Sequence, residues 1–151
     1  MNEDTTPTAN PVPDLGTYMQ QIPFARLLGF ELAKFGGGAS EIRYTPAPEH
    51  FNTFDVTHGG ACMTLLDVTM AAAARSDSPE DGVVTIEMKT SFMQPSVGPL
   101  HARGRLIHRT ASIAFVEATI YDTSERACAH STGTFKYVRK RGAIDRLPST
   151  D

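Results

Sequence analysis

The run from Ala61 to Arg75, ACMTLLDVTMAAAAR, constrains the fold more than any other part of the sequence. It contains no Gly or Pro and ends in strong helix formers, so it predicts a helix that begins at Gly59 or Gly60. Apolar residues surround the whole cylinder of that helix: Ala61, Met63, Leu65, Leu66, Val68, Met70 and Ala71 to Ala74. A helix that is apolar all round is typically buried, and a single helix is hidden only by a sheet that curves around it.

Strand-like segments on both sides of this helix can supply such a sheet. Two short runs flank a turn of three glycines, at 30–35 and 39–47. Four longer runs follow the helix, at 83–94, 100–108, 112–122 and 126–138. The short turns between successive runs predict an antiparallel meander. The predicted fold class is therefore α+β, a curved antiparallel β-sheet wrapped around one long central α-helix, and its free edges favour an oligomer.

Two local patterns refine this picture. Residues 15–29 predict a short helix that is interrupted near Pro23 and closed by Gly29. In the first strand after the long helix, regular alternation predicts one face formed by Val84, Ile86 and Met88 and another formed by Thr85, Glu87 and Lys89.

Composition bounds the kind of protein. The chain has 151 residues and a net charge of -3, which predicts one domain and disfavours a general nucleic-acid binder. No segment resembles a signal peptide or a membrane span, and Cys62 and Cys128 are expected to be free buried thiols. We therefore expect a cytoplasmic protein with a loose N-terminal tail (1–14), one folded domain (15–138) and a basic, polar C-terminal tail (139–151).

Polar residues near the start of the long helix have a distinctive spacing. Asn52 precedes His58-Gly59-Gly60 by six positions, Asp67 follows Gly59 by eight, and Thr85 lies in the strand after the helix. Over residues 20–138 this pattern resembles the hotdog-fold acyl-CoA thioesterases of the PaaI-like group. The resemblance implies a hotdog fold, an acyl-CoA substrate, assembly into dimers or tetramers, and no metal or other cofactor.

The same resemblance implies a role for each of these residues. The N–H of Gly59 would bind the thioester carbonyl with help from Asn52, at a helix end where backbone donors are unpaired and negative charge is favoured. Asp67 would act as general base or nucleophile, and burial would raise its pKa toward a useful range. Thr85 could hold the attacking water. His58 is grouped with the catalytic residues, although the resemblance gives it a structural part at the turn.

The spacing along the helix indicates that two chains share the site. Eight residues separate Asp67 from Gly59, or about 12 Å along a helix, so one carbonyl cannot contact both in a single chain. Two antiparallel helices from two chains would place Gly59 of one opposite Asp67 of the other. We therefore expect a dimer with two shared sites.

Other residues are candidates for binding the rest of the substrate. Gly60, Arg109 and Ser112 are expected to contact acyl-CoA, the last two at a turn between strands, and the basic run 136–141 offers further cations for the phosphates. Four large apolar residues are candidates for the acyl pocket, although they could equally be core: Met63, Met70, Phe92 and Met93. Such a pocket accepts aromatic, medium-chain or branched acyl groups.

Two other functions fit the same fold. His50-Phe51 partly matches the His-Phe-Pro of hydroxyacyl-thioester hydratases and dehydratases, but Asn52 stands where that group has Pro, and the helix carries Asp67 where a Glu is expected. A non-catalytic acyl-CoA-binding protein is the other alternative.

Overall fold

A computed structural model describes residues 14–139 of the chain, so the two predicted tails fall almost entirely outside the described residues. The chain begins with helix α1 (Leu15–Tyr18), a 3-10 turn (Met19–Gln21) and helix α2 (Pro23–Leu28). Gly29, with a φ of 76°, ends α2 in the left-handed conformation. The predicted interruption before Pro23 and the closure at Gly29 are confirmed.

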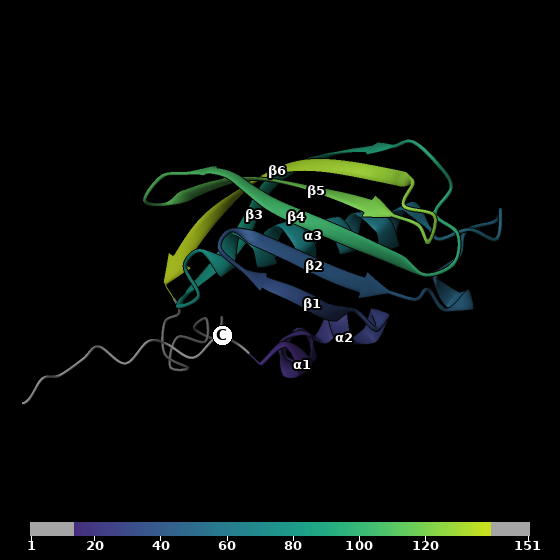
Figure 1. Ribbon diagram of the computed structural model, residues 1–151, viewed down its shortest axis with the longest axis horizontal. Coiled ribbons are helices and arrows are strands. Elements are labelled where there is room, and N and C mark those ends of the chain that lie inside the picture. The colour runs from purple at the N-terminus through teal and green to yellow at the C-terminus, as the bar shows by residue number, and fades with distance from the viewer. Residues whose placement is uncertain (1–13, 140–151) are drawn as a thin grey trace, which may run out of the picture.

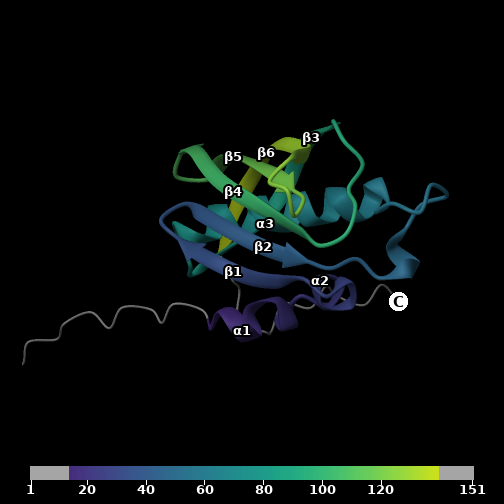
Figure 2. The same ribbon diagram turned by 45° about the vertical axis from the view of Figure 1, so that its right-hand side comes forward.

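Six strands form one antiparallel sheet that curves around helix α3 (Gly59–Ser76), as Figure 1 shows. The strands are β1 (Glu31–Gly36), β2 (Ala39–Tyr44), β3 (Asp81–Phe92), β4 (Leu100–Arg109), β5 (Ile113–Tyr121) and β6 (Ala127–Arg139). Their order across the sheet is β1-β2-β4-β5-β6-β3. Helices α1 and α2 lie beside β1 (Figure 2). The predicted α+β class with one central helix, the hotdog fold, is confirmed.

The position of β3 corrects the predicted meander. Strands β4, β5 and β6 follow one another as expected, but β3 pairs with β6 and not with β4. The connection from β3 to β4, residues 93–99, is not a tight hairpin turn: it contains Pro95 and Pro99 and carries the chain from the sheet edge to its middle. Strand β3 is consequently an edge strand whose outer side has no partner among the described residues.

Helix α3 is buried on most of its surface but not all of it. Leu65, Leu66 and Met70 have no exposed surface and form the centre of the core. Met63, Asp67 and Ala71 remain partly or fully exposed, and their spacing of four residues places them on one stripe of the helix. The expected burial on all sides is therefore incomplete, because the sheet covers α3 on the remaining sides only.

A β-bulge in β3 corrects the predicted alternation. The register with β6 shifts between Thr85 and Glu87, so Ile86 is an extra residue in the strand. Thr85 lies opposite the buried Phe135, and Met88 packs against the core. Both therefore face the helix, whereas strict alternation had placed them on opposite faces.

Close packing of α3 on the sheet gives a stability prediction. A Cβ atom on Gly104 would lie 2.7 Å from Ser40 Oγ and 2.8 Å from the Thr69 carbonyl oxygen, the two atoms that join β2 to α3 by a hydrogen bond. Gly104→Ala should therefore lower the free energy of unfolding by about 2 kcal/mol, the usual scale for overpacking a core. Gly36→Ala, whose Cβ would meet nothing within 4 Å, is the matched control, and urea denaturation of both variants checks the prediction. Equal stability of the two variants would contradict this account of the packing.

Candidate active site

Within the described residues, the first turn of α3 leaves the Gly59 N–H free to bind a ligand. His58 is the N-cap of the helix, and its Nδ1 accepts a hydrogen bond from the Gly60 N–H at 2.8 Å. The Gly59 N–H has no acceptor among residues 14–139. Gly59, rather than Gly60, therefore presents an unpaired N–H at the positive end of the helix dipole. This bond gives His58 a capping role at the turn.

Asn52 is held in place by the loop that leads to the helix. Its side-chain Oδ1 accepts hydrogen bonds from the N–H groups of Phe54 at 2.9 Å and Val56 at 3.4 Å. With the oxygen occupied in this way, the side-chain NH2 group is the part of the amide that can act as a donor toward a ligand.

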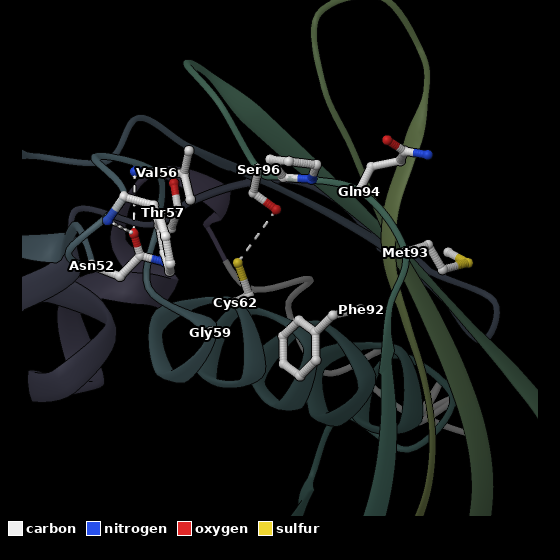
Figure 3. A pocket seen from close by; sticks show the side chains of 11 residues that line it. Asn52, Val56, Thr57, Gly59, Cys62, Phe92, Met93, Gln94 and Ser96 are labelled. Atoms are coloured by element: carbon white, nitrogen blue, oxygen red, sulfur yellow. Dashed lines mark hydrogen bonds between the residues drawn. The ribbon is translucent and has the colours of Figure 1, made fainter.

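A cavity of about 590 Å³ joins Asn52 and Gly59 (Figure 3). Most of its wall is apolar or aromatic and is formed by Phe54, Val56, Phe92, Met93 and Pro95. The ring of Phe92 lies 3.4 Å from the position that a Cβ atom on Gly59 would occupy, so Phe92 covers the first residue of the helix. An apolar cavity with a few convergent polar groups is the usual form of a small-molecule site.

Cys62 lies in the wall of this cavity, one turn after Gly59. Its thiol donates a hydrogen bond to Ser96 Oγ at 3.5 Å, and burial raises the pKa of the thiol above its ordinary value. Cys62 and Cys128 are both free and buried, as predicted. The raised pKa keeps Cys62 in its protonated, weakly nucleophilic form at neutral pH.

Asp67 and Thr85 form a second polar group, outside the cavity wall. The Thr85 hydroxyl donates a hydrogen bond to Asp67 Oδ1 at 2.7 Å. Asp67 is half-buried on the uncovered stripe of α3, and Thr85 is exposed on the edge strand β3. The bulge at Ile86 turns Thr85 toward the helix. Strict alternation along the strand therefore did not predict the contact between Thr85 and Asp67.

The structure does not bring the remaining candidates into this cavity. Met63 is 39% exposed on the uncovered stripe of α3, and Met70 is core. Arg109 and Ser112 lie near the opposite end of α3: the Arg109 guanidinium contacts Asp77 at 3.1 Å and stacks on the Tyr137 ring, and the Ser112 carbonyl accepts the Tyr137 N–H.

Several cavity residues were not singled out from the sequence. Phe54 and Thr57 come from the loop before α3, and Gln94 and Ser96 come from the β3–β4 connection. These segments are irregular, so neither helical nor strand periodicity marks which of their side chains point inward.

His50 forms hydrogen bonds with residues close to it in the sequence. Its Nδ1 lies 2.8 Å from the Tyr44 hydroxyl and 3.1 Å from the Ala47 nitrogen, and His50 is not among the residues that line the cavity. The histidine on which the hydratase interpretation depended is therefore part of the loop structure. Within residues 14–139, no cluster of His, Cys, Asp or Glu is arranged to hold a metal ion, and no helix is long and apolar enough to cross a membrane.

Comparison with known proteins identifies the family. The family model of the thioesterase superfamily matches residues 54–129, which is half of the chain and includes α3 and the strands β3, β4 and β5. The chain belongs to the thioesterase superfamily. The predicted resemblance to the hotdog-fold thioesterases is confirmed at this level.

Individual relatives agree with this assignment. A protein of Saccharolobus solfataricus named "Putative esterase SSO1253" is 26% identical over 91% of this chain and 93% of its own length. The solved structure of the conserved protein PA5202 from Pseudomonas aeruginosa has a TM-score of 0.73 and 29% identity, over 76% of this chain and 93% of that one. The PaaI protein of the E. coli phenylacetic acid degradation operon shares the fold, with a TM-score of 0.71 and 18% identity over 83% and 96% of the two chains.

The capping role of His58 can be separated from catalysis. His58→Ala should lower the free energy of unfolding by about 1 kcal/mol because it removes the N-cap acceptor, whereas His58→Asn should retain most of the stability because Asn is a good N-cap. Thermal or urea denaturation measures both. If His58 were a catalytic base, the well-folded Asn variant would still lose about 10²-fold in kcat, and that result would contradict the capping role.

Proposed function

We propose that the protein hydrolyses an acyl-CoA thioester at a site shared by two copies of the chain. The proposal depends chiefly on one observation: the cavity with Asn52 and Gly59 and the Asp67–Thr85 pair are separate in one chain, yet both border the same uncovered side of α3 and β3. Membership of the thioesterase superfamily supports the reaction class.

The uncovered side has the character of an interface. Strand β3 offers unpaired backbone groups along its outer edge. Large apolar side chains are exposed at the bulge of this strand, on the neighbouring stripe of α3 and at the cavity mouth: Met63 39%, Ile86 54%, Phe92 54% and Met93 49%. Contiguous exposed apolar side chains next to an open sheet edge are typical of a surface that is buried in an assembly.

A two-fold axis near Met63 would join the two halves of the site. Met63 is midway between Gly59 and Asp67 along α3, so antiparallel packing of two α3 helices there places Gly59 of one copy opposite Asp67 of the other. The same axis places Phe92, which covers Gly59, opposite Thr85 of the second copy, which binds Asp67. The helix and the strand therefore lead to the same arrangement.

In this arrangement the thioester carbonyl oxygen accepts hydrogen bonds from the Gly59 N–H and the Asn52 amide. These donors stabilise the negative charge that develops on that oxygen. Asp67 of the second copy, oriented by its Thr85 hydroxyl, either deprotonates a water that attacks the carbonyl carbon or attacks it directly as a nucleophile. The tetrahedral intermediate then collapses with loss of the CoA thiolate, which takes up a proton. If a water attacked, the free acid is formed at this step; if Asp67 attacked, the acyl–Asp67 anhydride that remains is hydrolysed by water, which releases the acid and restores the carboxylate. The apolar cavity holds an aromatic or medium-chain acyl group.

The same geometry gives Arg109 and Ser112 a place in substrate binding. Arg109 contacts Asp77, ten residues after Asp67, at the C-terminal end of α3, and Ser112 is in the turn that follows Arg109. In an antiparallel pair this end of the second copy extends about 15 Å beyond the first copy's Gly59. A pantetheine arm that leaves the cavity in this direction would bring the phosphates of CoA to the second copy's Arg109.

The test is thiol release from a panel of acyl-CoAs by the wild type and by Asp67→Asn. At least one ester should be hydrolysed, and the variant should lose about 10²-fold or more in kcat, because a positioned base or nucleophile is removed while the shape is kept. Asp55→Asn, an exposed carboxylate on the cavity loop, is the matched control and should retain activity. Binding of acyl-CoA without turnover would instead indicate a binding protein, and an Asp67→Asn variant as active as the wild type would remove Asp67 from the mechanism.

A further inference from the structure

Thr57 carries a polar group that the proposed mechanism does not use. Its side chain is 4% exposed, and its Oγ1 has no hydrogen-bond partner among residues 14–139. A buried hydroxyl without a partner is uncommon, because it loses its bonds to water without replacement. Such a group in the wall of a cavity suggests that the missing partner belongs to a ligand.

The backbone of Thr57, which is one of the residues that line the cavity, is held by two contacts. The Thr57 N–H donates to the Ser96 carbonyl at 3.0 Å, and Thr57 forms a β-bridge with Phe51. Figure 3 shows Thr57 on the same side of the cavity as Asn52, and Ser96 next to Cys62. The neighbouring Ser96 hydroxyl already accepts a hydrogen bond from the Cys62 thiol.

The chemistry of this hydroxyl differs from that of the two groups expected to bind the carbonyl. The Gly59 N–H and the Asn52 NH2 only donate, whereas the Thr57 hydroxyl can donate and accept. Thr57 is two positions before Gly59 in the chain, so their Cα atoms are at most about 7.6 Å apart. A substrate atom that contacts Thr57 must therefore lie within a few bonds of the thioester carbonyl carbon.

We infer that Thr57 selects acyl groups with an oxygen substituent close to the thioester, so that the preferred substrates are 3-hydroxyacyl or 3-oxoacyl thioesters. This inference rests on the proposed function. The Thr57 hydroxyl hydrogen-bonds the substituent oxygen, while the surrounding apolar wall holds the remaining carbon chain. An acyl group without this oxygen leaves the Thr57 hydroxyl unpaired in the complex, and a buried site discriminates against a ligand that leaves its polar group unpaired. Thr57 is in this sense a specificity-determining residue.

The test compares hexanoyl-CoA, 3-hydroxyhexanoyl-CoA and 3-oxohexanoyl-CoA. The wild type should prefer at least one of the two oxygenated esters over hexanoyl-CoA by about 10-fold in kcat/KM, the scale of one net hydrogen bond. Thr57→Val should abolish this preference by lowering kcat/KM for the oxygenated ester alone, and Thr57→Ser should keep it. Thr132→Val, the same change on the exposed face of β6, should leave the preference unaltered.

Binding separates this inference from the proposed function. Dissociation constants for the same three ligands are measured on the Asp67→Asn background, with and without Thr57→Val, so that turnover is not required. If the oxygenated ligands bind more tightly and Thr57→Val removes this preference, the inference is supported, even if no ester is hydrolysed. The absence of hydrolysis would refute only the proposed function. Equal binding of all three ligands, or an equal loss for all three in Thr57→Val, overturns the inference. Because Thr57→Val removes an unpaired buried hydroxyl at constant shape, its Tm should be at least that of the wild type.

Discussion

The packing of α3 against the concave face of the sheet is the interaction on which the rest of the structure depends. It buries Leu65, Leu66 and Met70 completely and relies on a close backbone approach at Gly104. The sheet has two edges and covers the helix on only part of its circumference. One stripe of α3, with Met63 and Asp67 on it, is left beside the open edge of β3. The same packing that stabilises the chain thus leaves an apolar surface that contains a carboxylate.

The N-terminus of α3 adds the second element of the site. A helix start has unpaired N–H groups, and here His58 satisfies the N–H of Gly60 while that of Gly59 stays open to the cavity. The two elements lie about 12 Å apart along the helix, so a single chain separates the donor from the carboxylate. In the assembly that we propose, an antiparallel pair of α3 helices would remove this separation and would cover exposed apolar side chains at the edge of β3 at the same time.

Much of the fold could be predicted from the sequence because it depends on strong local patterns. The uninterrupted apolar run after Gly60 indicates the buried helix, and the runs between turn residues indicate the strands. The order of the strands could not be predicted in the same way: the position of β3 beside β6 depends on long-range pairing, and short connections favour the simpler meander. The facing of Thr85 depends on one extra residue, Ile86, which has no local signature.

The sequence predicted some residues of the candidate site and missed others. The spacing of Asn52, Gly59 and Asp67 could be read directly and already indicated two chains. The cavity residues Phe54 and Thr57 lie in an irregular loop without periodicity, and the unpaired Thr57 hydroxyl is visible only once the surrounding loop is in place. Sequence patterns thus locate groups on regular elements, while the wall of the cavity depends on tertiary packing.

Complementation between two inactive variants tests the shared site most directly. Gly59→Pro removes the N–H at the first position of a helix, where proline is tolerated, and the ψ of 138° at the preceding His58 suits a following proline. Asp67→Asn removes the carboxylate. Each variant alone should be nearly inactive, but heterodimers purified with two different tags contain one intact site and should show about half of the wild-type activity per dimer. Heterodimers as inactive as their parents would show that Gly59 and Asp67 do not combine across two chains, and would contradict the account.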